Sequence, residues 1–320
     1  MVKYKIGRLN NNMAIKERTT RQLPVDLSSE ETLTDRVIAH ALSKQRNVFW
    51  PVFGVISESQ SEYDGQYIWK ESDTKYNLKS ASKVFHSAST QVSKMTMDNA
   101  LVICWGIANS TCNVGRLLAK NPNSVCAKCY GDHGAYIWHT TKTCHQKRLQ
   151  SLMRIIEDSR RYNQRYIEYV LAFASYINIK AKNRAKIGQD TYFRWLDMGD
   201  IQTSEKYKFF HLRIIRDIAR LCPMVKFWLP TKEYNLMLSW DLAGYRMPDN
   251  VNVLISNPMV DSEDVMRRWI DRKFRHPELY GTTLVSSQGH HTCKAYDNTP
   301  TMCGSCNKCW TTKHVIYPEH

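Results

Sequence analysis

The sequence lacks a long apolar run, and it also lacks a recognisable secretion signal. No segment approaches the roughly 20 consecutive apolar residues that a membrane-spanning helix needs, which excludes a helical membrane protein. The amino terminus, Met1–Lys5, is basic but no apolar core follows it, so we expect a cytoplasmic protein. In that compartment clustered cysteines indicate metal ligands or redox thiols, whereas a framework of disulfides would require a secreted chain.

Acidic residues are few for the number of basic ones. The chain has 45 Lys and Arg against 30 Asp and Glu, a formal net charge of +15. Such a surplus favours polyanionic partners, above all nucleic acid, and the alternative is a basic surface that serves solubility. The basic residues are spread along the chain, with no basic arm or tail and no sequence signature of a known nucleic-acid-binding fold. Charge therefore leaves both interpretations open.

The sequence also has no internal repeat and no low-complexity tract, which excludes a repeat architecture. Residues 1–96 predict an N-terminal extension that carries no chemical motif. Its capping box at residues 28–31 predicts a helix through Leu42, and short strands are expected near Trp50, Ile56 and Trp69. Residues 97–290 predict the main domain, and residues 291–320 a C-terminal cysteine-rich loop.

Strand and helix patterns alternate through the main domain. Repeated strand–helix units imply a parallel sheet joined by right-handed crossovers. Five strands suit a partial (β/α) barrel better than a closed eight-stranded one, and an open doubly wound sheet is the alternative. The predicted strands are 100–105, 191–196, 225–229, 251–256 and 282–286, and the predicted helices are 143–175, 204–221, 233–242 and 261–273.

Polar residues follow the carboxyl ends of these strands, where parallel α/β folds build their active sites. The two aspartates after the second strand would hold an ammonium group, ribose hydroxyls or a metal, or else cap the helix near Ser204. The lysine after the third strand is expected as an anion contact, or as a solvated lysine in a turn. The candidate residues of this kind are Asp197, Gly199, Asp200, Lys232 and Ser256.

Three cysteines, Cys112, Cys126 and Cys129, follow the first predicted strand. Three thiolates leave one metal position open, as chemistry requires, and a [4Fe–4S] cluster held in this way keeps one iron available for a substrate or cofactor. The alternatives are ordinary buried thiols or a zinc site with a histidine as fourth ligand. The histidines near enough in sequence for a zinc site are His133, His139 and His145.

A second group of four cysteines lies near the carboxyl end of the chain: Cys293, Cys303, Cys306 and Cys309. Four thiolates close the coordination shell of a metal, as structure or electron transfer requires. Overlapping Cys-x-x-Cys steps with a distant fourth cysteine are typical of ferredoxin-like loops and favour an auxiliary [4Fe–4S] cluster. Structural zinc is the alternative, although zinc sites prefer two separated pairs.

One stretch of the chain resembles the core of the radical S-adenosylmethionine enzymes. It consists of the first strand, the cysteine loop that ends with Cys126–Tyr130, a helix, and the second strand, which ends with Met198–Asp200. The resemblance implies that the open iron binds the amino and carboxylate groups of S-adenosylmethionine beside Tyr130. It also implies that Gly199 and Asp200 bind the amino group. The chain departs from that pattern in having thirteen residues, in place of three, between its first two cysteines.

A second set of motifs resembles phage proteins of the gene-product-eighty-eight type and related three-cysteine-motif proteins. This resemblance covers about residues 97–310 and implies a viral or mobile-element origin, with the host cytoplasm as the compartment. The motifs are Thr111-Cys112, Cys126-x-x-Cys129-Tyr130, Arg194-Trp195-x-Asp197-x-Gly199-Asp200, Phe227-Trp228-x-x-Thr231-Lys232 and Cys303-Gly304-x-Cys306-x-x-Cys309-Trp310.

These patterns lead to one main expectation about function. We expect an iron–sulfur protein with one or two [4Fe–4S] clusters that acts as a radical S-adenosylmethionine-like enzyme on a nucleic acid or nucleotide. The alternative is a metal-stabilised protein without enzymatic activity that binds nucleic acid or a host protein, with zinc at the four-cysteine site.

Overall fold

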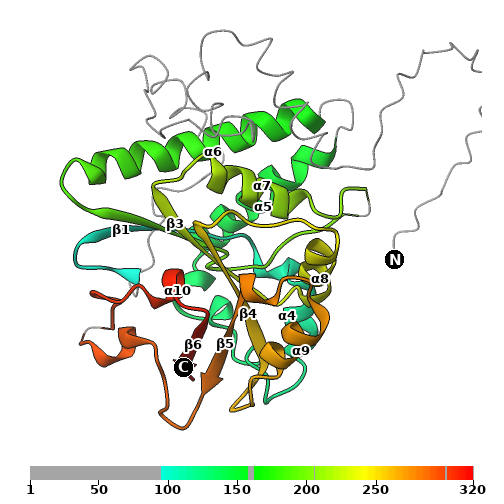
Figure 1. Cartoon of the computed structure of the whole chain (residues 1–320), viewed down its shortest axis with the longest axis vertical. Coiled ribbons are helices and arrows are strands. Elements are labelled where there is room, and N and C mark those ends of the chain that lie inside the picture. Colours follow the sequence, from blue (N-terminus) through cyan, green and yellow to red (C-terminus); the bar gives the residue numbers. More distant parts are fainter. Residues whose placement is uncertain (1–94, 158–161, 205, 300, 320) are drawn as a thin grey trace, which may run out of the picture.

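The structure is a computed structural model that describes residues 95–157, 162–204, 206–299 and 301–319. It is an α/β fold whose six parallel strands follow one another in sequence order across a single curled sheet, a half-barrel with two free edges (Figure 1). The expected partial α/β barrel is confirmed at this level. The helix and short strands expected within residues 1–94 lie outside the described residues.

All five expected strands are present, and a sixth follows them. The strands are β1 Ala100–Trp105, β2 Asp190–Trp195, β3 Val225–Thr231, β4 Val251–Val260, β5 Tyr280–Ser286 and β6 His314–Pro318. β6 pairs with β5 from His314 opposite Thr282 to Pro318 opposite Ser286. The sequence analysis missed β6 because the strand is short and half-exposed, with a proline at its end, so it carries little of the apolar pattern of a buried strand.

The helices lie where the sequence patterns predict them, with three differences. The expected helix 143–175 is two helices, and the helix expected from 261 begins at Val265. The helix expected from Ser204 begins only at Phe210, and the Ser204 hydroxyl accepts a hydrogen bond from Tyr207 N (2.9 Å) in a preceding turn. The longer helices are α5 His139–Glu157, α6 Tyr162–Ala185, α7 Phe210–Arg220, α8 Tyr234–Leu242 and α9 Val265–Lys273. The short helices are α4 Asn113–Leu118, α10 Lys308–Thr311 and the 3-10 turns η2 Asn109–Thr111, η3 Tyr130–Asp132, η4 Gly134–Ile137, η5 Pro277–Leu279 and η6 Lys294–Asp297.

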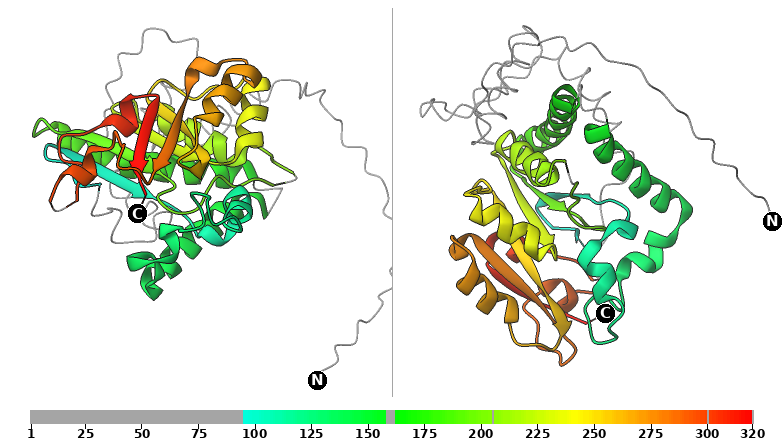
Figure 2. Two further views of the ribbon diagram at one scale, coloured as in Figure 1. Left: turned by 90° about the horizontal axis from the view of Figure 1, so that it is seen from below. Right: turned by 90° about the vertical axis from the view of Figure 1, so that its right-hand side faces the viewer.

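The convex face of the sheet carries the main hydrophobic core. Alternate residues of each strand, such as Phe193 and Trp195 on β2, point to this face and pack against the helices outside the sheet (Figures 1 and 2). Phe173 of α6 packs on Trp105 and Trp195 at ring-centroid distances of 5.5 and 5.1 Å. Because both faces of these strands are buried, the strands read as nearly continuous apolar runs in the sequence.

The concave face is covered by the chain's own C-terminal region. Residues 291–312, which we call the four-cysteine segment, lie on the sheet residues whose side chains point inward. The indole nitrogen of Trp310 donates a hydrogen bond to the carbonyl oxygen of Phe193 (2.9 Å). Asn252 Nδ2 donates to the carbonyl oxygens of Cys309 (2.9 Å) and Thr312 (2.8 Å). The inside of the half-barrel is therefore a second, smaller core that contains thiols.

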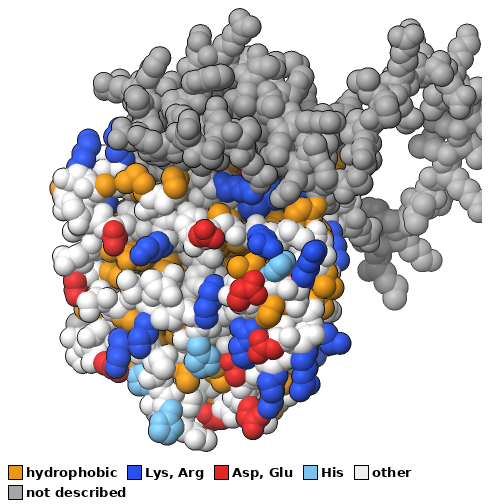
Figure 3. All heavy atoms as spheres, viewed as in Figure 1, with side chains coloured by type: hydrophobic (Ala, Val, Ile, Leu, Met, Phe, Trp, Pro, Cys, Tyr) orange, Lys and Arg blue, Asp and Glu red, His pale blue; other side chains and the backbone are white. Residues whose placement is uncertain are grey.

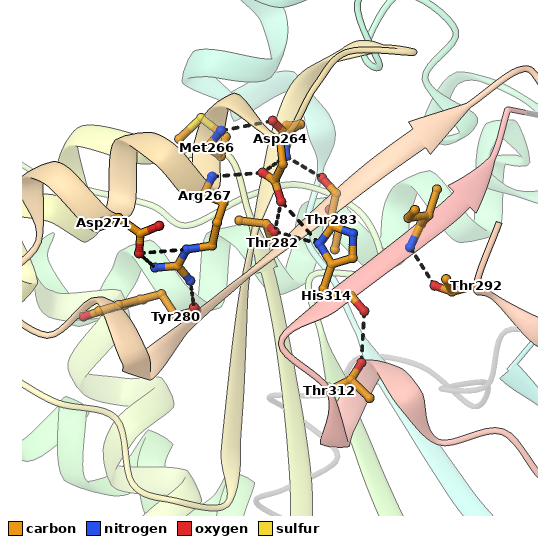
Figure 4. Close-up of polar contacts among 12 residues, drawn as sticks. Asp264, Met266, Arg267, Asp271, Tyr280, Thr282, Thr283, Thr292, Thr312 and His314 are labelled. Carbon is orange, nitrogen blue, oxygen red and sulfur yellow. Dashed lines mark hydrogen bonds and ion pairs between the residues drawn. The ribbon is translucent and has the colours of Figure 1, made fainter. Parts of the chain in front are cut away.

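The last strand is joined to α9 through one carboxylate (Figure 4). Asp264 caps α9 by accepting from Arg267 N (2.9 Å), and the same oxygen accepts from Asn257 Nδ2 (2.8 Å). Its other oxygen accepts from the Thr282 hydroxyl (2.5 Å) and lies 3.2 Å from His314 Nδ1. This contact links β4, β5, β6 and α9.

No helix in the described part of the chain is both long and apolar enough to cross a membrane.

Candidate functional site

Strands β1 and β2 approach each other so closely at their carboxyl ends that two glycines are required there. A Cβ on Gly106 would lie 2.2 Å from Asp197 Oδ1. A Cβ on Gly199 would lie 2.6 Å from Ile107 Cγ1 and 2.7 Å from its carbonyl oxygen, and Gly199 has a φ of +79° that disfavours other residues. Gly199 thus has a steric role in bringing the segment after β1 against the segment after β2.

The carboxylate of Asp200 is buried and is used by the chain itself. It accepts hydrogen bonds from Ile201 N (2.8 Å), the Thr231 hydroxyl (2.7 Å) and Lys232 N (2.9 Å). Burial raises the pKa of Asp200, and these donors act in the opposite direction. Asp200 therefore joins the end of β2 to the end of β3, and does not cap the helix that follows it in sequence.

Glu233 extends this connection to the first cysteine group. Its backbone N–H donates to Thr231 Oγ1 (3.0 Å), and its carboxylate oxygen Oε1 lies 3.5 Å from Val114 N in the first turn of α4. That turn begins at Cys112, the N-cap residue of α4. Glu233 is buried, and burial together with the nearby charge of Asp200 raises its pKa to about 7.

Cys112, Cys126 and Cys129 lie together on residues 109–132, which we call the three-cysteine loop. Burial, followed by Asp200 and the thiols of Cys129 and Cys126, raises the pKa of Cys112 to about 12, and Lys232 acts in the opposite direction. Burial raises the pKa of Cys126 as well, against the same lysine. The three thiols are thus within electrostatic range of one another, and the positive charge of Lys232 acts on Cys112 and Cys126.

The three-cysteine loop is fixed at several points of the carboxyl rim, by which we mean the segments that follow the strands. Val125 N donates to the carbonyl oxygen of Pro258 (3.0 Å), just beyond the regular part of β4. Lys128 Nζ forms an ion pair with Glu319 (3.0 Å), directly after β6. The loop therefore starts after β1 and reaches across the opening of the half-barrel to its far edge.

Tyr130, at the end of the three-cysteine loop, contacts the end of β2. Its hydroxyl donates to the carbonyl oxygen of Asp197 (2.7 Å) and accepts from Arg194 Nη2 (3.1 Å). The hydroxyl of Tyr136 lies 3.4 Å from Asp197 Oδ2. Asp197 Oδ1 is buried, and no donor of a described residue reaches it. Tyr130 and Asp197 are therefore brought together as neighbours, on the side of the loop that faces β2.

Ser256 contributes through its backbone. Its carbonyl oxygen accepts a hydrogen bond from the Tyr234 hydroxyl (2.9 Å). Tyr234 is within electrostatic range of Cys126, Asp200 and Glu233, all of which raise its pKa after the larger effect of burial. The tyrosine therefore occupies the space between Ser256 and the three-cysteine loop, and the sequence analysis did not single it out.

The histidines offered as zinc ligands lie apart from one another. His145 is buried in α5 and stacks on Tyr136 at 5.9 Å, and burial lowers its pKa. His139 lies at the exposed start of α5, with its Nε2 3.5 Å from the Thr143 hydroxyl. His133 caps η4 and is exposed. No contact between these three histidines and the cysteines of the loop is present among the described residues.

The four-cysteine segment brings its thiols within electrostatic range of one another on the concave face. Cys293, Cys303 and Cys309 are each 8% exposed, and Cys306 is half-buried. Cys306 N donates to the carbonyl oxygen of Cys303 (2.9 Å), and Gly304 between them has a φ of +56°. Burial is the main cause, and the thiol of Cys293 a smaller one, of a pKa raised to about 12 at both Cys303 and Cys309.

All ten cysteines are free thiols. Within the described residues, no three His, Cys, Asp or Glu side chains stand in metal-coordinating positions. The chemistry of the two donor sets nevertheless suits zinc or an iron–sulfur cluster, because each consists of soft sulfur ligands. Metal binding there requires loss of the thiol protons and movement of the side chains onto the metal.

Two residues central to this arrangement, Arg194 and Glu233, were not among the residues predicted from the sequence. Arg194 lies inside β2, and its role depends on which face of the strand it occupies. Glu233 directly follows Lys232 at the end of β3. The rule that strand ends build the site would have indicated Glu233, but no short-range pattern indicated its contact with α4.

The fold and the site define the class: an α/β half-barrel protein with one cysteine group at the carboxyl rim and another on the concave face. The chain belongs to the gene product 88 family, whose model matches residues 70–312. No curated protein and no solved structure matches the chain. The family match agrees with the second resemblance seen in the sequence, and none of the comparisons links the chain to the radical S-adenosylmethionine enzymes.

Proposed function

We propose that this protein is an iron–sulfur enzyme of phage type, in which Cys112, Cys126 and Cys129 hold a [4Fe–4S] cluster that leaves one iron open. The observation that carries the proposal is the convergence of these thiols at the carboxyl rim beside Lys232. Three soft ligands at the catalytic edge of a parallel sheet are the arrangement of an open metal site. The four-cysteine segment would hold a second cluster, or structural zinc.

The second cofactor in this proposal is S-adenosylmethionine. A [4Fe–4S] cluster with an open iron would supply the chemistry of one-electron reductive cleavage of the sulfonium, with the electron drawn from an external reductant. Lys232 would attract the carboxylate of the amino-acid part. Because three donors already occupy the carboxylate of Asp200, that residue would act by fixing Thr231 and Lys232 in place. Tyr130 would form the wall of the S-adenosylmethionine site that lies next to β2.

The proposed substrate class is a nucleic acid or nucleotide, on the ground of the net charge of +15. On the face drawn in Figure 3, Lys and Arg side chains are distributed over the surface with acidic side chains between them. A distributed basic surface suits a phosphate backbone better than one small anion. Binding should then weaken steeply as salt rises, because each phosphate contact releases counterions.

The test is anaerobic purification, with iron, sulfide and zinc counted per chain and the visible spectrum recorded. About eight irons with equal sulfide would support two clusters. The variant Cys126→Ala/Cys129→Ala should lose about four of them and all cleavage of S-adenosylmethionine. Cys144→Ala, which removes a thiol outside both groups, is the matched control. Zinc alone, without iron–sulfur absorbance, would exclude the radical enzyme and favour a metal-stabilised protein that binds nucleic acid or a host protein.

A further inference from the structure

Arg194 lies at the centre of the concave face, between the two cysteine groups. The strand register places it beside Cys104 of β1 and opposite Trp228 of β3. Alternation along β2 sends Phe193 and Trp195 to the convex core and Arg194 to the inner face. The guanidinium in this position is half-buried between the thiol of Cys104 and the ring of Trp228, and its Nε is fully buried.

The direct contacts of Arg194 are to a ring, a hydroxyl and the Met95 thioether, and the charge of Asp197 acts on it only at longer range. Its guanidinium carbon lies 4.6 Å from the ring centroid of Trp228, and Nη2 donates to the Tyr130 hydroxyl at 3.1 Å. Its Nε is buried and has no acceptor, and Arg194 forms no ion pair with any described residue. A buried N–H without an acceptor, on a guanidinium that has no direct ion pair, favours a further anionic acceptor on the concave face.

A series of aromatic contacts connects Arg194 with the four-cysteine segment. Trp228 packs on Trp310 at 5.7 Å and stacks on Tyr317 at 6.4 Å. The hydroxyl of Tyr317 lies 3.2 Å from Cys309 Sγ. Burial raises the pKa of both Cys303 and Cys309, and the charge of Arg194 acts against that effect at each thiol. Arg194 is thus within electrostatic range of these thiols, and Trp228 lies between it and Trp310.

We propose that Arg194 is the charge partner of a metal–thiolate centre held by Cys293, Cys303, Cys306 and Cys309, and that its contact with Tyr130 couples this centre to the three-cysteine loop. This inference rests on the proposed metal binding at the four-cysteine segment. Four thiolates carry more negative charge than zinc or an iron–sulfur cluster neutralises, so either metal leaves an anionic centre on the concave face. Arg194 stabilises that centre by charge and by the donor Nε–H.

The test uses the Cys126→Ala/Cys129→Ala background, in which metal signals come from the four-cysteine segment alone. Arg194→Gln should speed metal release to a chelator, bathophenanthroline disulfonate for iron or pyridylazoresorcinol for zinc, by about 10- to 100-fold. A cluster should also show a lower reduction potential, because a nearby positive charge favours the reduced form. Arg194→Lys keeps the charge but loses the planar contact with Trp228, and should lie between wild type and Arg194→Gln.

Arg213→Gln is the matched control, because Arg213 is also half-buried and lies over an aromatic ring, Tyr245 at 6.0 Å, but on the helical layer. Release and potential should be unchanged in that variant. If Arg194→Gln and Arg194→Lys both keep the metal as tightly as the parent does, the inference is overturned. If this parent binds no metal at the four cysteines, the inference fails together with the second cluster of the proposed function. The first cluster, at the three-cysteine loop, is tested separately, by the metal that the wild-type protein holds and the Cys126→Ala/Cys129→Ala variant loses.

Discussion

The hydroxyl of Thr231 donates a hydrogen bond of 2.7 Å to the carboxylate of Asp200, and this contact joins the ends of two neighbouring strands. The same carboxylate accepts from Lys232 N, so the position of Lys232 beside the three-cysteine loop depends on Asp200. The residue that sequence resemblance assigns to cofactor binding thus has a structural role that is visible in its contacts.

Replacement of Asp200 should therefore destabilise the protein. Asp200→Ala removes three hydrogen bonds and leaves buried donors without a partner, and we expect a loss of about 3 kcal/mol in the free energy of unfolding. Denaturant unfolding measures this loss. Asp190→Ala, at the exposed start of β2, is the control and should change the free energy by less than about 0.5 kcal/mol. Equal midpoints for the two variants would show that the contact at the strand ends contributes nothing.

Gly199 should tolerate no side chain. In Gly199→Ala the new Cβ meets Ile107 and also has to adopt a φ of +79°, so we expect a loss of about 3 kcal/mol in stability. Gly188→Ala is a sharp control, because its φ of +69° imposes similar backbone strain while no atom lies within 4 Å of the new Cβ. That variant should lose only about 1 kcal/mol. A Gly199→Ala loss no larger than the control value would contradict the close approach of β1 and β2.

The buried carboxyl of Glu233 should make stability depend on pH. Its pKa rises from 4.5 to about 7 on folding, so the folded protein holds a proton that the unfolded chain has released. The stabilising contribution is complete below pH 4.5 and is lost as pH rises through about 7. In metal-free protein, Glu233→Gln should flatten the fall in unfolding free energy between pH 5 and 8.

Glu263→Gln is the control for this experiment, since Glu263 is exposed and pairs only with Arg268. It should leave the pH profile of wild type unchanged. The assignment to Glu233 fails if the slope between pH 5 and 8 survives in Glu233→Gln.

Removal of the cap at Asp264 should loosen α9 and β6 together. Asp264→Ala loses the bond from Arg267 N and the contacts with Thr282 and His314, and we expect a cost of about 2 kcal/mol. Asp271→Ala is the control, because it removes only an exposed pair with Arg267 on the same helix and should cost about 0.5 kcal/mol. Hydrogen exchange should show faster exchange at Ile316 N in the first variant only. An unchanged exchange rate at Ile316 N would show that Asp264 does not stabilise β6.

Much of the fold was predictable because its signals are local. The inward and outward alternation of residues such as Cys104 and Trp105 produced apolar runs that marked β1 to β5, and helical spacing marked the helices between them. β6 escaped because His314–Pro318 is short and half-exposed, begins with a polar residue, ends with proline and pairs along one edge only. The split between α5 and α6 escaped because apolar periodicity continues on both sides of it.

By itself the sequence determined the strand–helix order and the two cysteine groups, because periodicity and Cys-x-x-Cys spacing act over a few residues of backbone. Only the tertiary structure decided that the four-cysteine segment lies on the concave face, that Glu233 meets the first turn of α4, and that Arg194 stands between the two groups of thiols. These contacts join residues far apart in sequence. They depend on the curl of the sheet and on packing summed over many residues, which no short stretch of sequence encodes.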